Sequence, residues 1–154
     1  MIVGARVDFR LIHGQVGNLW ANARQVSRFM VVDDQVSEDA VQKQVLRMAT
    51  PATCKLSVLP VEKAAANILA GKYDAQRLFI VVKKPEVYVK LAKAGVKFDE
   101  IILGNITSMN IAKSYNRNLN CGQDDVDALT ELSSMGIPMV IQLTPQNNPE
   151  PFKL

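Results

Sequence analysis

The stretch Leu78-Phe79-Ile80-Val81-Val82 is an unbroken apolar run, followed directly by Lys83-Lys84. A short run without polar interruption is typical of a strand in a sheet that is covered on both faces. A helical pattern from Pro85 to Ala94 comes next and closes on Gly95, the residue type that most often ends a helix. This succession predicts one strand-helix unit in the middle of the chain.

The same alternation extends in both directions. Apolar runs predict buried strands at Ile2–Val7, Phe29–Val32, Lys55–Leu59, Ile101–Leu103 and Met139–Leu143, and a short strand within Ile111–Asn118. Helical patterns lie in the segments Val16–Ala23, Ser37–Met48, Pro60–Ala70 and Asp124–Met135. Alternation of this kind indicates an α/β fold, with an open, mostly parallel sheet and helices on both faces. The Pro- and Asn-rich tail from Thr144 is expected to be irregular.

Two of these helices carry clear boundary or packing signals. Val16, Leu19, Trp20 and Ala23 recur at helical spacing, which predicts a face packed on the core. Ser37 is the expected N-cap of the following helix, because Glu38 and Asp39 would then lie in its first turn, where carboxylates suit the helix dipole. Val41, Val45 and Met48 continue this helix until Thr50-Pro51 ends it.

Composition limits the functional classes. A length of 154 residues, 48% hydrophobic and 21% charged, is typical of one globular domain. The net charge of +3 favours anionic ligands or acidic partners but is too small to indicate nucleic-acid binding. Cys54 and Cys121 lack metal-ligand spacing and are expected to be reduced thiols. The N-terminal residues lack a signal-peptide pattern, and no apolar run is long enough to span a bilayer.

The only histidine, His13, follows the first predicted strand and precedes a predicted helix. At such a junction, backbone N–H groups of residues such as Gly14 and Gln15 can point at an anion. Arg10 supplies a planar, permanently charged fork that can bridge two phosphoryl oxygens. Asp8 is placed to hydrogen-bond the loop or the second ring nitrogen and so fix the tautomer. The residues predict a phosphate-accepting histidine.

Other interpretations of His13 are weaker. Arg-His-Gly phosphatases and mutases need that tripeptide and a second histidine, whereas Ile12 precedes His13 here and no second histidine exists. One imidazole with scattered carboxylates makes no recognisable metal site. A non-enzymatic regulatory or binding module, whose His13 loop binds an anion without turnover, is the second hypothesis.

Charged residues follow several of the other predicted strands and should share the same rim of the sheet. Asp33-Asp34 either binds a cation or a ribose, or closes a turn and caps a helix. Lys83-Lys84 and Arg6 either dock an acidic partner or form a solvated face. Asn105 is expected at the rim from topology alone.

The segment Asp8-Phe9-Arg10-Leu11-Ile12-His13-Gly14-Gln15-Val16 closely resembles the phosphorylation loop of IIB components of the mannose/fructose/sorbose family of the bacterial phosphotransferase system, which typically reads Asp-Asp-Arg-Leu-Ile-His-Gly-Gln-Val. The resemblance continues through Val31-Val32-Asp33-Asp34, the helix ending at Pro51, the Gly104-Asn105 turn and Glu131-Leu132…Gly136, and so covers nearly the whole chain. Phe9 departs from the pattern, because it replaces the second aspartate and puts the role of that carboxylate in doubt.

The resemblance implies a seven-stranded sheet between helices, formed by a single IIB domain over residues 1–154, with His13 on the loop after the first strand. It implies that His13 takes a phosphoryl group from a phosphohistidine of a IIA partner, with Nδ1 as the acceptor nitrogen. His13 would then pass the group to a sugar held by the membrane IIC/IID permease. Phosphoenolpyruvate is the implied ultimate phosphoryl source.

The resemblance also bears on cofactors, location and substrate. No metal or cofactor is implied, and the domain is expected to be cytoplasmic and attached to the membrane only through the permease. The sugar is bound by that partner, so its identity is not encoded in this loop. N-acetylgalactosamine, sorbose, mannose and fructose systems all use similar loops, and the overall resemblance favours an amino sugar.

Overall fold

A seven-stranded sheet forms the centre of the molecule in a computed structural model that describes residues 1–154. Its strand order is β3-β2-β4-β1-β5-β8-β9. The strands are β1 (Ile2–Asp8), β2 (Arg28–Val32), β3 (Lys55–Leu59), β4 (Leu78–Val82), β5 (Ile101–Asn105), β8 (Met139–Ile141) and β9 (Glu150–Pro151). All neighbours pair in parallel except β8 and β9. The predicted mostly parallel α/β fold is therefore confirmed.

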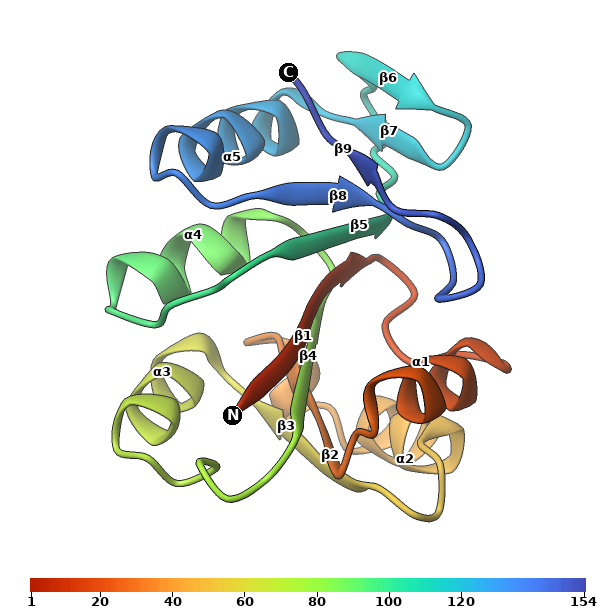
Figure 1. Ribbon diagram of the computed structural model, residues 1–154, viewed down its shortest axis with the longest axis vertical. Coiled ribbons are helices and arrows are strands. Elements are labelled where there is room, and N and C mark those ends of the chain that lie inside the picture. Colours follow the sequence, from red (N-terminus) through yellow and green to blue (C-terminus); the bar gives the residue numbers. More distant parts are fainter.

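Five α-helices cover the two faces of the sheet (Figure 1). They are α1 (Val16–Arg24), α2 (Ala40–Ala49), α3 (Val61–Leu69), α4 (Glu86–Lys93) and α5 (Gln123–Ser134). One face carries α1 and α2, and the other carries α3, α4 and α5 (Figure 1). The chain first runs from β1 through α1 and α2 to β3, at one side of the sheet, and then returns through α3, α4 and α5 toward the other side. Since crossovers are right-handed, this change of direction makes the loops at the carboxyl ends of the central strands leave toward opposite faces.

The central strand β4 is apolar throughout because both of its faces are buried. Leu78, Ile80 and Val82 belong to the core cluster under α3, α4 and α5. Phe79 and Val81 belong to the second cluster, under α1 and α2. The Phe79 ring lies 5.5 Å from both the Trp20 and the Phe29 ring. Trp20 is thus a core residue, as its helical spacing predicted, whereas Ala23, the last residue of the predicted core face, is exposed.

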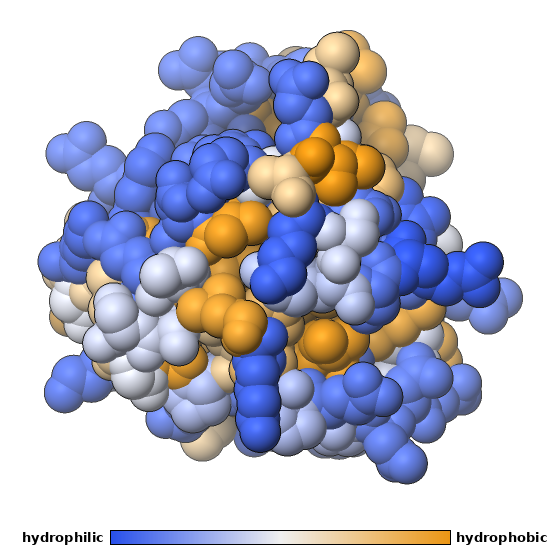
Figure 2. Space-filling view, turned by 90° about the horizontal axis from the view of Figure 1, so that it is seen from above, coloured by the Kyte–Doolittle hydropathy of each residue, from blue (hydrophilic) through white to orange (hydrophobic).

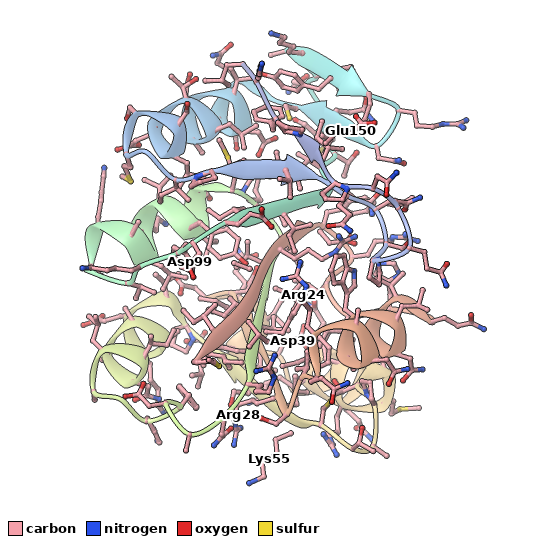
Figure 3. The ribbon with its side chains drawn as sticks, viewed as in Figure 1. Arg24, Arg28, Asp39, Lys55, Asp99 and Glu150 are labelled. Atoms are coloured by element: carbon pink, nitrogen blue, oxygen red, sulfur yellow. The ribbon has the colours of Figure 1, made fainter.

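Arg24, at the end of α1, fastens that helix to the first strand. Its Nη1 donates a 2.8 Å hydrogen bond to the Val3 carbonyl, and its guanidinium lies 5.4 Å from the Trp20 ring centroid. Figure 3 shows its side chain in the space between α1 and β1. The contact sets the position of α1, whose first residue follows the His13 loop.

The N-cap of α2 differs from the predicted one. Asp39, not Ser37, caps the helix, because its carboxylate accepts from the backbone N–H groups of Val41 and Gln42. Ser37 lies instead in a short 3₁₀ turn, Val36–Glu38, whose first N–H donates to Asp33. Both residue types cap helices well, and the extra turn moves the helix start by a few residues.

The helical stripe of α2 also faces outward. Its residues Val41, Val45 and Met48 are exposed, and Leu46 is the buried residue of the helix. The helix predicted from this stripe is present, but the stripe does not form the core contact.

The predicted short strand within Ile111–Asn118 is one arm of a separate hairpin. Strands β6 (Lys113–Asn116) and β7 (Leu119–Cys121) pair antiparallel outside the main sheet. The Asn116 side chain closes the turn, because its Oδ1 accepts from the N–H groups of Asn118 and Leu119. Only two residues separate the two short strands, so a search for single apolar runs does not resolve them as a hairpin.

The tail, expected to be irregular from Thr144, is irregular only up to Pro149. It then adds β9 to the edge of the sheet, and Phe152 packs edge-on against Tyr115 of the hairpin, with ring centroids 4.8 Å apart. Seen from this end, apolar residues gather in the middle of a mostly hydrophilic face (Figure 2). The tail thus connects the sheet edge to the hairpin.

Both cysteines are free and buried. Burial raises the pKa of the Cys121 thiol to about 11, which keeps it in the unreactive thiol form near neutral pH. No helix of the structure is long and apolar enough to cross a bilayer.

The contact between Gly4 and Phe79 provides a test of the core. A Cβ added at Gly4 would overlap the Phe79 ring, which Trp20 and Phe29 hold in place. We expect Gly4→Ala to lower the free energy of unfolding by about 1–3 kcal/mol in denaturant titrations, because overpacking forces neighbours from their minima. The cost of Gly4→Ala should shrink in a Phe79→Leu background. Wild-type stability of the single variant would contradict this packing.

Candidate functional site

The loop Phe9–Gln15 leaves the carboxyl end of β1 and is anchored on the core by two apolar side chains. Leu11 and Ile12 are buried in the cluster under α1 and α2. Leu11 has a φ of +60°, a left-handed conformation that is costly for this residue type, and its N–H donates to the Asp8 carbonyl at 2.9 Å. Gly14 also has a positive φ, +51°, which glycine adopts without penalty. This conformation presents His13 beside the end of β1.

Asp8, the last residue of β1, receives four donors although it is completely buried. Its Oδ1 accepts from the Arg10 N–H at 3.0 Å. Its Oδ2 lies 3.2 Å from Arg6 Nη2, 3.1 Å from Asn105 Nδ2 and 3.2 Å from His13 Nε2. Buried carboxylates are tolerated only when paired and hydrogen-bonded in this way. The carboxylate of Asp8 therefore acts as an acceptor toward every neighbour.

The contact with Asp8 fixes the tautomer of His13. Because the carboxylate accepts, Nε2 must carry the hydrogen of the neutral ring, and Nδ1 must carry the lone pair. Nδ1 has no hydrogen-bond partner in the protein, and the side chain is 20% exposed. The ring is thus held by one nitrogen, and its other nitrogen is free to act as a nucleophile.

Arg6 lies beneath this site and not on a solvated or docking face, which corrects both interpretations of it from the sequence. Its side chain is 2% exposed. Besides contacting Asp8, it donates to the carbonyls of Gln142 and Leu143, each at 2.8 Å, and so joins β1 to the segment after β8. Burial lowers the pKa of the guanidinium, and the charge of Asp8 opposes this shift.

Arg6 also explains a glycine in the neighbouring strand. A Cβ at Gly104 would overlap the Arg6 guanidinium, so the absence of a side chain there makes room for the buried cation. On its other side the guanidinium lies 5.4 Å from the Trp20 ring centroid. Alternation along β1 predicts that Arg6 faces one side of the sheet, but not that this side holds a cavity for it.

The loop that carries His13 also holds groups that suit an anion. The backbone N–H groups of His13, Gly14 and Gln15 donate to no group in the protein. Gln15 makes no side-chain cap at the start of α1, and no acidic residue lies in the first turn. Such an uncapped helix N-terminus favours negative charge. Arg10 is exposed, and its guanidinium makes no hydrogen bond or ion pair within the protein.

The remaining rim residues mostly have structural partners. Asp33 and Asp34 accept from the N–H groups of Val36 and Val61, so they close turns, as one of the two interpretations expected. Asn105 reaches the site through its hydrogen bond to Asp8. No three His, Cys, Asp or Glu side chains are grouped so that they could hold a metal ion.

Lys84 pairs with acids at the start of α5. Its ammonium contacts Asp124 and lies 3.6 Å from Asp125. Burial disfavours the charged form of Lys84, but the hydrogen bond to Asp124 and the charges of both acids outweigh it and raise the Lys84 pKa. Burial also raises the pKa of Asp125. This lysine therefore holds α5 to the end of β4.

Comparison with protein families gives one match over almost the whole chain. The model of the sorbose-subfamily IIB component of the phosphotransferase system matches residues 2–154. A sorbose-specific EIIB component of Lacticaseibacillus casei is 29% identical over 93% of this chain and 87% of its own length. An N-acetylgalactosamine-specific phosphotransferase enzyme IIB component of Escherichia coli is 30% identical over 94% of this chain and 91% of its own length. The mannose-specific EIIAB component of Escherichia coli is 30% identical over 92% of this chain but only 44% of its own length.

Solved structures give the same result. The IIB domain of the sorbose permease from Klebsiella pneumoniae superposes with a TM-score of 0.91, at 26% identity over 97% of this chain and 91% of that one. An N-acetylgalactosamine IIB component from Streptococcus pyogenes superposes with a TM-score of 0.87, at 30% identity over 96% of this chain and 90% of that one.

The His13 tautomer can be measured directly, because the chain has one histidine. We expect the ring ¹⁵N shifts of the neutral imidazole to show hydrogen on Nε2 and a lone pair on Nδ1. Asp8→Asn should weaken this preference, since the amide can donate as well as accept. A neutral wild-type ring with hydrogen mainly on Nδ1 would contradict the Asp8 contact.

Removal of the Arg6 charge should be costly. Arg6→Met leaves Asp8 buried without its cation, so we expect the free energy of unfolding to fall by about 3–5 kcal/mol in denaturant titrations. The double variant Arg6→Met/Asp8→Asn should lose less than the sum of the single losses, because neither charge is then stranded. A loss below about 1 kcal/mol, as for an exposed ion pair, would show that Arg6 is not buried with Asp8.

Proposed function

Because the chain belongs to the sorbose-subfamily IIB components of the sugar phosphotransferase system, whose members are phosphotransferases, we propose that His13 is its phosphoryl carrier. His13 would accept the phosphoryl group of a IIA protein and pass it to a sugar bound by the membrane IIC/IID permease. The observation that carries this proposal is the 3.2 Å contact between buried Asp8 and His13 Nε2, which leaves Nδ1 unprotonated and without a partner.

Transfer from the histidine of the IIA protein to His13 needs no net movement of protons. The Nδ1 lone pair of His13 forms a bond to phosphorus while the bond between phosphorus and the donor histidine nitrogen breaks, and the donor imidazole regains its lone pair. The hydrogen on Nε2 stays on the ring, directed at Asp8. As the ring gains positive character in the adduct, the Asp8 carboxylate stabilises it. In delivery to the sugar, a hydroxyl oxygen would bond to phosphorus while the bond between phosphorus and Nδ1 breaks and returns the lone pair to Nδ1. The hydroxyl proton would leave to a base outside this chain, because the Nε2 hydrogen stays directed at Asp8.

Charge on the moving phosphoryl group is offset by donors around Nδ1. The unpaired N–H groups of Gly14 and Gln15 lie at the start of α1, where a helix favours an anion. Arg10 supplies an exposed, unpaired guanidinium that can bridge two phosphoryl oxygens. In a loose phosphoryl-transfer transition state, catalysis depends on this kind of positioning and charge stabilisation. Asp8, Arg10, His13, Gly14 and Gln15 are thus our assigned site residues.

Two relatives support the proposed partners. The Escherichia coli mannose relative is an EIIAB component, so an A unit and a B unit work within one polypeptide there. The Klebsiella structure is the IIB domain of a sorbose permease. We infer that this chain acts between a IIA protein and a permease, in the cytoplasm, with membrane contact through that permease. The sugar would be bound by the permease, because the groups that recognise the sugar are not part of the His13 loop.

Phosphorylation with phosphoenolpyruvate and the upstream carriers tests the proposal. We expect one acid-labile phosphoryl group per chain in wild type and none in His13→Ala, measured by intact mass. Arg10→Ala should fold normally, because its side chain has no partner, and should transfer about 10²-fold more slowly. Lys72→Ala, which removes an exposed cation in the loop after α3, is the matched control and should transfer at the wild-type rate.

Equal labelling of His13→Ala and wild type would exclude His13 as the carrier. Phosphate binding by a wild type that is never labelled would favour the alternative, an anion-binding regulatory module. Unfolding of Arg10→Ala would show that Arg10 has a structural role and would contradict its assignment to charge stabilisation.

A further inference from the structure

Phe9 is an exposed aromatic residue directly beside the proposed phosphoryl site. It directly follows Asp8, which is fully buried, yet its own side chain is 39% exposed and belongs to neither core cluster. Its N–H donates to the Asn105 carbonyl at 3.1 Å, and the next N–H, of Arg10, donates to Asp8 Oδ1 at 3.0 Å. Because these bonds fix the backbone on both sides, Phe9 is held in an outward position.

A second exposed apolar residue, Leu143, has its backbone near the same carboxylate. It is 38% exposed, and its carbonyl accepts from Arg6 Nη2, the atom that also contacts Asp8 Oδ2. Phe9 and Leu143 therefore lie next to the buried Asp8–Arg6 pair in two separate segments, the loop after β1 and the loop after β8. Both residues are exposed, and exposed apolar residues that gather at a site indicate a contact surface.

Any protein that donates a phosphoryl group to His13 must cover Phe9. The His13 side chain is only 20% exposed, and the reacting atoms must approach to about 3–3.5 Å before transfer. Even a small transient interface buries about 600 Å² on each partner, a patch of about 14 Å radius. Phe9 follows Asp8, whose Oδ2 is 3.2 Å from His13 Nε2, so it lies within such a patch centred on the ring.

We propose that Phe9, together with Leu143, is the apolar docking contact for the IIA phosphodonor, which would present a complementary apolar area next to its own phosphohistidine. This inference rests on the proposed function. An aromatic side chain on a fixed backbone loses little freedom on binding, and aromatic residues carry a large share of interface energy. Phe9 is a docking residue and not a catalytic one, because the protein supplies the chemistry from Asp8, Arg10 and His13.

Two phosphoryl donors separate docking from chemistry. The phosphorylated IIA protein that labels wild type fastest is used over a range of concentrations, and phosphoramidate serves as a small donor that needs no protein contact. We expect Phe9→Ala to raise the KM for the IIA protein about tenfold, the size typical of losing one interface anchor, with the phosphoramidate rate within about twofold of wild type. Phe9→Leu should keep part of the affinity, and Leu143→Ala should raise the KM to a smaller extent.

The matched control is Leu69→Ala, an exposed leucine at the end of α3, beyond the opposite end of the sheet, which should change neither rate. An unchanged KM of Phe9→Ala for the IIA protein would overturn the proposal. It would do so even if this variant transferred the group to the permease more slowly, because Phe9 would then contact the permease. An equal loss with both donors would overturn it too, because Phe9 would then shape the site itself. Failure of both donors to label wild type would reject the phosphocarrier function, and with it this inference.

Discussion

The buried pair formed by Arg6 and Asp8 is the constraint on which the functional loop depends. Two opposite charges taken from water are costly unless every remaining donor and acceptor is used. Here Asp8 accepts from Asn105, the Arg10 N–H and His13, while Arg6 donates through Nη1 and Nη2 to two carbonyls after β8, and only its Nε is left without a partner. The pair therefore joins β1, β5 and β8 at the same end of the sheet. A fully apolar replacement would pack there, but it would leave the imidazole without a fixed orientation.

The apolar core supports this polar arrangement from one side. Leu11 holds a left-handed conformation that would be unfavourable in a free loop, and burial of its side chain, with that of Ile12, stabilises it. The Trp20 ring centroid lies 5.4 Å from the guanidinium groups of both Arg6 and Arg24, so the same ring contacts the site and the end of α1. Packing and electrostatics thus fix the His13 loop together.

Most of the fold could be predicted from the pattern of apolar residues. The burial of Leu78–Val82 on both faces and the core position of Trp20 both follow from this pattern. The loop residues were also readable, because Asp8, Arg10, His13 and Gly14 are close in sequence. Arg6 was misjudged because its burial depends on a space left by Gly104, nearly a hundred residues away. Asp39 and Ser37 are equally suitable caps by type, and a strand as short as β9 has no periodicity to detect.

The two outer strands of the sheet bear on whether the protein aggregates at high concentration. Unpaired strand edges act as templates for other chains, and proteins blunt them with charges, proline or short strands. One edge here is β9, which is only Glu150–Pro151, and the other is β3, which starts with exposed Lys55. Figure 3 shows Glu150 and Lys55 at opposite ends of the molecule. Both sides of the sheet are therefore protected against edge-to-edge aggregation.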